Sequence, residues 1–304
     1  MSYCLQPDPP LADEIRGVAR EQLDKARLEL SRATAEEEAA AVHATRKHIK
    51  KIRALLRLVR AEIGGAIFRG ENRRLRDVAR SLAGARDARV QLQVVEKLRA
   101  EADLEGTAFT RTTATLKQEI AALKNHLGPE RRAAETILQQ IGDRLEGWPL
   151  EDLKVKDLCT ALRQTYRRGR KCRRKLGAAS DPESFHEWRK RVKDLRSQLR
   201  LLQNLDPPMF CKMAEDAGTL SRQLGELHDL AFLRARLESG EDFDEAERAV
   251  LLGLLCLREG ALETSALEFG ARFFAEKPGA LKQRLRRATR AWAAASGAAV
   301  RADA

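Results

Sequence analysis

Residues 42–59 read VHATRKHIKKIRALLRLV, and residues 185–202 read FHEWRKRVKDLRSQLRLL. The two segments align without a gap at a constant offset of 186 − 43 = 143 residues. Basic and apolar positions agree together, so chance is a poor explanation, and the chain contains an internal repeat. The aligned basic pairs are His43/His186, Arg46/Arg189, Lys47/Lys190, Lys50/Lys193, Arg53/Arg196 and Arg57/Arg200.

Each copy of the repeat fits a helix that carries two stripes. Apolar residues recur in steps of three and four, from Val42 to Val59 in the first copy and from Phe185 to Leu202 in the second. Most of the basic residues follow the same steps and form a second stripe, roughly 100–120° around the helix from the first. A cationic stripe that flanks the apolar one tends to line a cleft between packed helices.

A solvated helix face is the ordinary explanation for a run of charge. Such faces usually mix acids and bases at a spacing of four residues, whereas residues 41–60 hold seven Lys and Arg and no acid. Crowding of like charges costs a few tenths of a kcal/mol per pair. The repeated stripe is therefore interpreted as an anion-binding site.

Other basic residues extend this prediction. Residues 163–175 contain eight Lys and Arg and no acid, and residues 281–290 contain five and no acid. Arg20 and Arg163 match at the same offset of 143, so the helix before each stripe is expected to contribute.

Composition predicts an all-α protein. The chain has 304 residues, 43% of them hydrophobic and 34% charged, which argues against intrinsic disorder. Ala, Leu, Glu, Lys, Gln and Arg dominate, and strand-like alternation is absent. About ten helices are expected, near residues 11–32, 35–61, 71–103, 107–127, 130–146, 150–176, 182–205, 208–238, 243–275 and 279–295.

The 143-residue period is far longer than that of a solenoid repeat. It predicts two pseudo-symmetric halves, residues 10–147 and 149–295, which face each other and bring equivalent stripes to a common seam. The whole chain, 1–304, is expected to be a single domain with a frayed tail at 296–304. A weaker repeat at an offset of 142 aligns residues 82–87 with 224–229. It adds Arg86 and His228 to the candidate binding residues.

The sequence lacks membrane-spanning and secretion signals, and the cellular location is predicted from this. The longest apolar run, Ala249–Leu257, is too short to cross a membrane, and the first residues do not resemble a signal peptide. Five dispersed cysteines favour reduced thiols over disulfides or a zinc site. A cytoplasmic protein without membrane association is expected.

The formal charge of 57 − 45 = +12 indicates a polyanionic partner bound in a salt-dependent way. Binders of single-stranded nucleic acid present aromatic platforms, but only 5% of this chain is aromatic. Proteins that recognise double-stranded DNA usually contain motifs such as a helix-turn-helix or a zinc finger, and this sequence contains neither. A chain of bare phosphates is favoured, and nonspecific binding of nucleic acid is the alternative.

Enzyme chemistry finds little support in the sequence. A di-iron bundle needs two Glu-x-x-His motifs, and only Glu183 to His186 matches. No Walker A, HExxH, nucleophile-elbow or kinase signature occurs, and the stripes lack acidic ligands for catalytic Mg²⁺. A binding module with no catalytic residue, no metal site and no cofactor is predicted. A catalytic or accessory component of polyphosphate metabolism is the second alternative.

The duplicated motif resembles that of the CHAD (conserved histidine α-helical) domain family. Its pattern of a His followed by Arg or Lys at +3, +7 and +10 occurs from His43 and again from His186. A following segment like LGxxRD resembles residues 82–87, while its second copy has His228 in place of Arg86. The resemblance covers roughly residues 10–295. It implies a basic central channel that binds inorganic polyphosphate, and localisation to polyphosphate granules.

Roles follow for the motif residues. The arginines are expected to bridge phosphate oxygens through forked donors, the lysines to supply compact charge and the imidazoles to donate hydrogen bonds. Mg²⁺ is expected only as a counterion of the ligand. The predicted polyphosphate-binding residues are His43, Arg46, Lys47, Lys50, Arg53, Arg57, His186, Arg189, Lys190, Lys193, Arg196, Arg200, Arg20, Arg163, Arg86 and His228.

Overall fold

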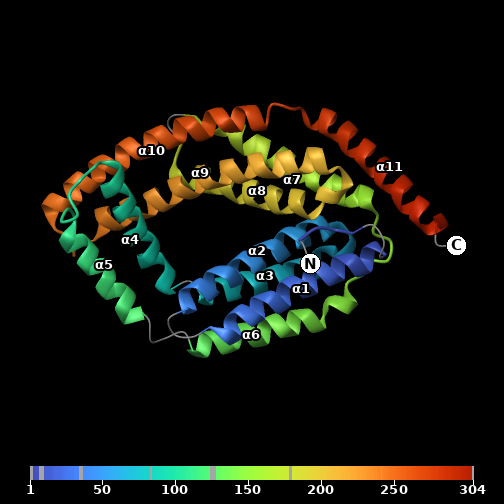
Figure 1. The fold of residues 1–304 in the computed structure, drawn as a ribbon, viewed down its shortest axis with the longest axis horizontal. Helices are drawn as coiled ribbons and strands as arrows, with labels where there is room; N and C mark the ends of the chain where they lie inside the picture. The colour runs from blue at the N-terminus through green and yellow to red at the C-terminus, as the bar shows by residue number, and fades with distance from the viewer. Residues whose placement is uncertain are drawn as a thin grey trace.

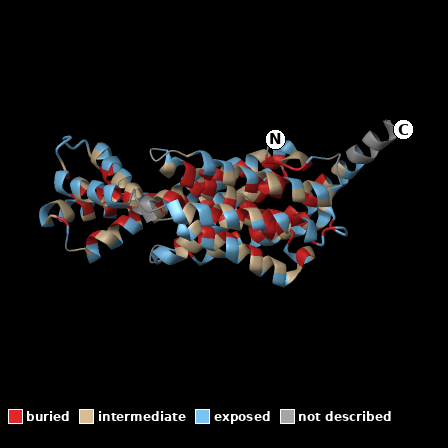
Figure 2. Ribbon diagram, turned by 90° about the horizontal axis from the view of Figure 1, so that it is seen from below, coloured by how far each residue is buried: buried red, intermediate tan, exposed pale blue. Residues whose placement is uncertain are grey.

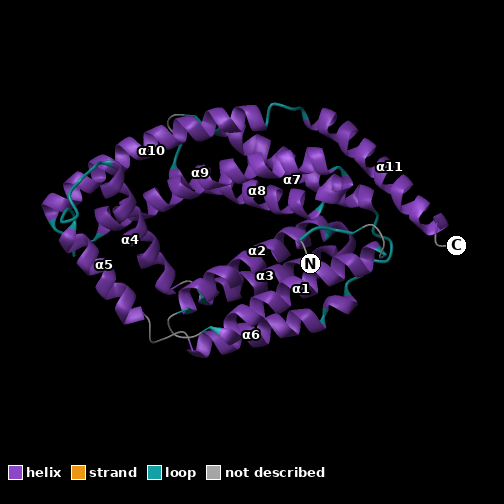
Figure 3. Cartoon of the chain, in the orientation of Figure 1, coloured by secondary structure: helices purple, strands orange, loops and turns teal. Residues whose placement is uncertain are grey.

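The computed structural model describes residues 3–6, 10–33, 37–82, 84–123, 128–177, 180–240 and 242–302, with side chains except at 84–87, 123 and 295–302. Helices form all of the regular structure in this part of the chain (Figure 3). They are α1 (Leu11–Arg32), α2 (Glu38–Leu58), α3 (Arg60–Ser81), α4 (Gly84–Glu101), α5 (Thr110–Leu123), α6 (Gly128–Asp143), α7 (Val155–Lys175), α8 (Pro182–Leu201), α9 (Pro207–Ser239), α10 (Glu245–Phe273) and α11 (Pro278–Ala302). Two short 3₁₀ turns, η1 (Leu145–Gly147) and η2 (Gln203–Leu205), complete the set.

The structure confirms the all-α fold predicted from composition, and part of the helix arrangement is repeated. The pair α1–α2 recurs as α7–α8, and each repeated helix packs against its own half through its apolar stripe. Ile49, Ile52 and Leu56 of α2 are buried, as are Val192, Leu195 and Leu199 of α8. Buried segments alternate with exposed ones along the helices and gather where the helices pack together (Figure 2). Burial of this apolar surface is the main stabilising term.

The predicted single helix at 71–103 is wrong. The chain forms α3 from Arg60 and then, after Ser81, a separate helix α4. The Gly64–Gly65 pair suggests a loop in the sequence, but only Gly64 leaves the helical region, with φ of 76°. Glycine tolerates this left-handed conformation without strain, so the chain turns at one residue and α3 resumes at once.

Other predicted helix ends differ by a few residues from those observed. The predicted helix at 182–205 ends at Leu201 and is followed by η2, and α7 begins at Val155 rather than at 150. α11 extends to Ala302, beyond the predicted helix end at residue 295. Helix ends are the least certain part of a sequence prediction.

The break after α3 makes the halves unequal. In the second half, α9 runs unbroken for 33 residues from its Asp206 cap. In the first half, α4 and α5 turn away and pack on α9 and α10 of the other half (Figure 1). Arg111 pairs with Asp244 at 2.5 Å, and the Thr112 amide donates to Glu247 at 2.8 Å. The α4–α5 hairpin therefore closes one end of the space between the halves.

The N-terminal segment joins the halves at the opposite end. The Leu5 amide donates to the Leu201 carbonyl at 2.8 Å, and Asn204 donates to the Leu5 carbonyl at 2.9 Å. The Tyr3 hydroxyl donates to the Lys51 carbonyl of α2 at 3.0 Å. Residues 3–6 thus connect α2 of the first half with α8 and η2 of the second.

Leu5→Ala is expected to lower the free energy of unfolding by about 2–5 kcal/mol, because the Leu5 side chain is completely buried. Urea denaturation measures this loss. Gln6→Ala, at the exposed neighbouring position, serves as the control and should stay within about 0.5 kcal/mol of the unchanged protein. Equal stability of the two variants would contradict the role assigned to this segment.

Candidate anion-binding cavity

The two repeated helices meet near their C-terminal ends. The Gln198 side chain of α8 donates to the Ala54 carbonyl of α2 at 3.2 Å, and Arg57 pairs with Asp194 at 3.2 Å. From this contact the ribbons of α2 and α8 separate toward their N-terminal ends (Figure 1). The repeat therefore forms a wedge whose narrow end is at the contact.

A cavity of about 980 Å³ lies in the wide part of this wedge. The N-terminal turns of α2 and the stripe of α8 form two walls, and α4 and α9 contribute most of the others. Six Lys and Arg and one His line it, against three carboxylates, so its potential attracts anions. The charged lining residues are His43, Arg89, Lys97, Arg189, Lys193, Arg196 and Arg222, with Glu38, Glu226 and Asp229.

Two glycines of α9 make room for the arginines of α8. A Cβ atom on Gly218 would lie 3.1 Å from Nε of Arg196, and one on Gly225 would lie 3.4 Å from Nη2 of Arg189. Gly218 and Gly225 are seven residues apart, and so are Arg189 and Arg196. Seven residues correspond to about two helical turns. The guanidinium groups of α8 therefore lie directly against the backbone of α9, at the wall of the cavity.

One ion-pair cluster ties α4 to α9 beside the cavity. Glu226 accepts from Lys97 at 2.6 Å and from Arg258 of α10 at 2.6 Å. Burial by itself raises the pKa of Glu226, but the hydrogen bonds from Lys97 and Arg258 outweigh it and lower the pKa below its usual value. Glu226 is thus held as a carboxylate and compensates part of the charge on Lys97.

The stripe of the first copy is arranged differently. His43 lines the cavity, but Arg46 donates to the Ala79 carbonyl, and Nε of Arg53 donates to Asn72 at 2.9 Å. Burial, reinforced by the neighbouring charge of Arg57, lowers the pKa of Arg53 to about 10. These arginines therefore lie along α3, on a surface that adjoins the cavity through His43.

Asp194 is the acid at the contact between the two copies. Burial raises the pKa of its carboxyl, and the positive charges of Arg57, Arg191, Arg53 and Arg168 act in the opposite direction. In the repeat this position aligns with Lys51, which lies under the electrostatic influence of Arg200. The two sides of the contact therefore differ in charge, although the helices are related by the repeat.

The duplicated histidines occupy different places. His43 lines the large cavity, whereas His186 lines a second one of about 170 Å³ together with His228. The Nδ1 atoms of His186 and His228 are 3.1 Å apart, and the ring centroids are 4.4 Å apart. Burial, with a further effect of Lys190, lowers the pKa of His186. The structure thus brings the predicted residue His228 to His186 rather than to the large cavity.

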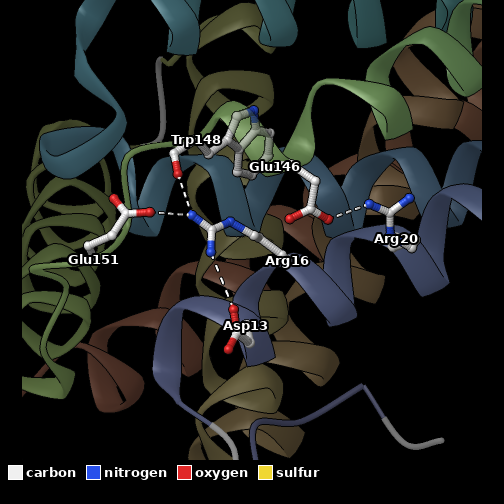
Figure 4. A network of polar contacts seen from close by, with 6 residues as sticks. All are labelled: Asp13, Arg16, Arg20, Glu146, Trp148 and Glu151. Atoms are coloured by element: carbon white, nitrogen blue, oxygen red, sulfur yellow. Dashed lines mark hydrogen bonds and ion pairs between the residues drawn. The ribbon is translucent and has the colours of Figure 1, made fainter.

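Arg20 lies at the join between the halves (Figure 4). Its guanidinium pairs with Glu146 at 2.8 Å, and one turn earlier Arg16 contacts Asp13, the Trp148 carbonyl and Glu151. This places Arg20 in an ion pair between α1 and η1, outside the lining of the cavity.

The remaining predicted residues are also placed. Lys190 faces outward and pairs with Glu187 at 2.5 Å. Lys47, Lys50, Arg163 and Arg200 are not among the described residues that line either cavity, and the side chain of Arg86 lies outside the described residues. Of the sixteen predicted residues, the structure brings His43, Arg189, Lys193 and Arg196 together in the large cavity.

Sequence reasoning missed Arg89 and Lys97 of α4 and Arg222 of α9. Arg89 and Lys97 come from a helix whose position depends on the break after α3, and no repeat partner marks them. Gly225 could have been recognised from the sequence, because it belongs to residues 224–229, the second copy of the weaker repeat. Gly225 follows Gly218 by seven residues, just as Arg196 follows Arg189. This equal spacing could have predicted that α8 packs on α9 with its arginines against these glycines.

These features define an all-α protein in which a duplicated basic helix contributes to a cavity between two related halves. The chain belongs to the CHAD domain family, whose model matches residues 17–238. No match was found among curated proteins. No helix of the described part of the chain is long and apolar enough to cross a membrane.

Two solved structures have a similar fold. The CHAD domain from the plant Ricinus communis superposes with a TM-score of 0.67 at 19% identity, over 88% of this chain and 95% of that one. PptA from Streptomyces chartreusis superposes with a TM-score of 0.62 at 14% identity, over 88% of this chain and 100% of that one. At these identities the likeness concerns the fold.

Proposed function

We propose that this chain binds inorganic polyphosphate in the cavity between its halves. The observation that carries the proposal is the lining of the cavity, to which six Lys and Arg from α4, α8 and α9 contribute together with His43 of α2. A linear chain of phosphates presents charge at every unit. Several cations on different walls can therefore bind it at the same time.

The chemistry of the lining favours phosphate over nucleobases. Guanidinium groups such as those of Arg189 and Arg196 donate two parallel hydrogen bonds to phosphate oxygens. The described residues that line the cavity include no Phe, Tyr or Trp, so nucleobases would lack the large aromatic platforms on which they usually stack. Nonspecific binding of nucleic acid through its phosphates is the second candidate, supported by the charge of +12.

A catalytic role in polyphosphate metabolism is a third candidate. Phosphoryl transfer needs carboxylates that hold Mg²⁺, and the cavity contains Glu38, Glu226 and Asp229. Glu226 already accepts from Lys97 and Arg258, which favours a structural role for it. We propose binding without turnover, with Mg²⁺ only as a counterion, and association with polyphosphate granules in the cytoplasm.

A competition titration tests this function. Long-chain polyphosphate, RNA and DNA are compared at physiological salt, and incubation of labelled polyphosphate with Mg²⁺ follows any turnover. Polyphosphate is expected to displace RNA and DNA and to be recovered intact. Equal affinity for nucleic acid would favour the second candidate, and release of phosphate would favour the third.

Gly218→Ala is expected to weaken polyphosphate binding about tenfold while the fold is retained. The new methyl group would lie 3.1 Å from Nε of Arg196, so this guanidinium must shift by a few tenths of an ångström from its position on α9. A displaced charged hydrogen bond costs about 1.5–3 kcal/mol. Gly260→Ala, on α10 with open space around its Cβ position, is the control and should bind normally. Unchanged affinity of Gly218→Ala would contradict the position given to Arg196.

A further inference from the structure

The basic segment 163–175 divides into two sets of side chains on α7. Arg170 donates to the Phe274 carbonyl at 2.8 Å, and Arg173 donates to the Leu267 carbonyl at 2.8 Å. These two arginines therefore join α7 to the C-terminal part of α10. The other set is exposed and forms what we call the α7 ridge: Arg167, Arg168, Lys171, Arg174 and Lys175.

The α7 ridge follows helical spacing. Arg167, Lys171 and Lys175 are four residues apart, and Arg168 and Arg174 lie beside them, so the ridge covers about 12 Å of one helix face. Among the described residues, no carboxylate lies within ion-pair distance of any of the five. On the neighbouring face of α8, by contrast, both Lys190 and Arg191 pair with Glu187.

Helix stability does not account for this arrangement. Cations in the last turn of a helix are stabilised by the helix dipole, which explains Arg174 and Lys175. The effect does not reach Arg167, Arg168 and Lys171, which lie one to two turns earlier. Like charges four residues apart are destabilising. An anionic ligand along the ridge would remove this repulsion.

The α7 ridge adjoins the stripe of the first copy. Helix α7 packs on both α2 and α8. Arg57 of α2 pairs at 3.2 Å with the buried Asp194 of α8, and the charge of Arg168 also acts on this carboxyl. Arg57 ends the stripe that begins at His43, about 21 Å away along α2, and His43 lines the cavity. The stripe of α2 therefore runs from the cavity at His43 to Arg57, which acts on Asp194 together with Arg168. Arg46 and Arg53, between these two ends, turn toward α3.

We infer that the α7 ridge binds the outer segment of a polyphosphate chain whose other segment occupies the cavity. This inference rests on the proposed function and adds a preference for long chains. A short chain reaches only the cavity, whereas a long chain binds both places, and the second binding step is intramolecular. Linked binding of this kind raises affinity by about 10²–10⁴-fold when the geometry allows both segments to bind.

The test compares Arg167→Gln/Lys171→Gln/Arg174→Gln with a control variant, Lys282→Gln/Arg286→Gln/Arg290→Gln. The control removes the same charge from exposed, similarly spaced positions of α11. The sequence prediction includes segment 281–290, but none of its residues, all of which the structure describes, lines either cavity. Calorimetric titrations with tripolyphosphate and with long-chain polyphosphate are made over a range of salt concentrations. The ridge variant is expected to bind long chains about tenfold or more weakly and tripolyphosphate as the unchanged protein does. Its slope of log K against log salt should fall by about 0.7 for each phosphate that the ridge no longer neutralises.

Three results would overturn the inference: unchanged binding of long chains, an equal loss of affinity for both ligands, or an equal loss of affinity in the α11 control. A ridge variant that binds RNA more weakly but polyphosphate normally would also overturn it, in favour of a nucleic-acid surface. Failure of the proposed function has a different signature, because the unchanged protein would then bind neither tripolyphosphate nor long-chain polyphosphate.

Discussion

Replacing Arg189 and Arg196 together by alanine is expected to weaken polyphosphate binding by about a hundredfold or more. Each guanidinium lies on a glycine of α9 at the wall of the cavity, where a charged hydrogen bond contributes about 1.5–3 kcal/mol. Removing two such bonds costs at least about 3 kcal/mol, which is more than two orders of magnitude in Kd. Calorimetric titration at fixed salt measures the change.

Matched variants separate this effect from a general reduction of charge. Lys190→Ala removes a cation of the same helix that faces outward and pairs with Glu187, and its affinity should change little. Arg189→Lys/Arg196→Lys keeps the charge and removes the forked donors, and an intermediate effect is expected. Circular dichroism should show the same helicity throughout. If Lys190→Ala weakened binding as much as the double variant, the cavity would not be the binding site.

A large decrease in stability is also expected for Gly270→Ala. A Cβ atom at this position would lie 2.4 Å from Cη2 and 2.5 Å from Cζ2 of Trp188, whose side chain is completely buried. Neither the ring nor the backbone of α10 can move without disturbing the core. Overpacking of this kind costs about 1–3 kcal/mol or more. The free energy of unfolding, measured by urea denaturation, should fall by about 3 kcal/mol.

Gly253→Ala is the matched control on the same helix. The position is exposed, and no neighbouring atom lies within 4 Å of the new Cβ. Alanine restricts the unfolded chain and favours the helix, so this variant should gain about 0.4–1 kcal/mol. Opposite signs for two identical substitutions on α10 would establish the close approach of Trp188 to Gly270. A decrease of less than about 0.5 kcal/mol for Gly270→Ala would contradict it.

The sequence predicted the elements of the site better than their arrangement. The helical phase of Arg189, Lys193 and Arg196 is a property of α8 alone, and these residues do share one wall of the cavity. The sequence predicts the same position around the helix axis for Arg46, Arg53 and Arg57 of α2. Their helix, however, packs beside α3, and their guanidinium groups contact Ala79, Asn72 and Asp194. Periodicity gives the direction of a side chain from its helix axis, and it does not give the neighbour in that direction.

The repeat at an offset of 143 residues, the all-α fold and the basic stripes beside the apolar ones follow from the sequence alone, because helical periodicity is a local property. Only the tertiary structure decided which basic residues meet. The break between α3 and α4 sends Arg89 and Lys97 across to the other half, and the glycines of α9 bring it close to Arg189 and Arg196. These residues are distant in the chain and meet only because of how whole helices pack, and no local pattern encodes that packing.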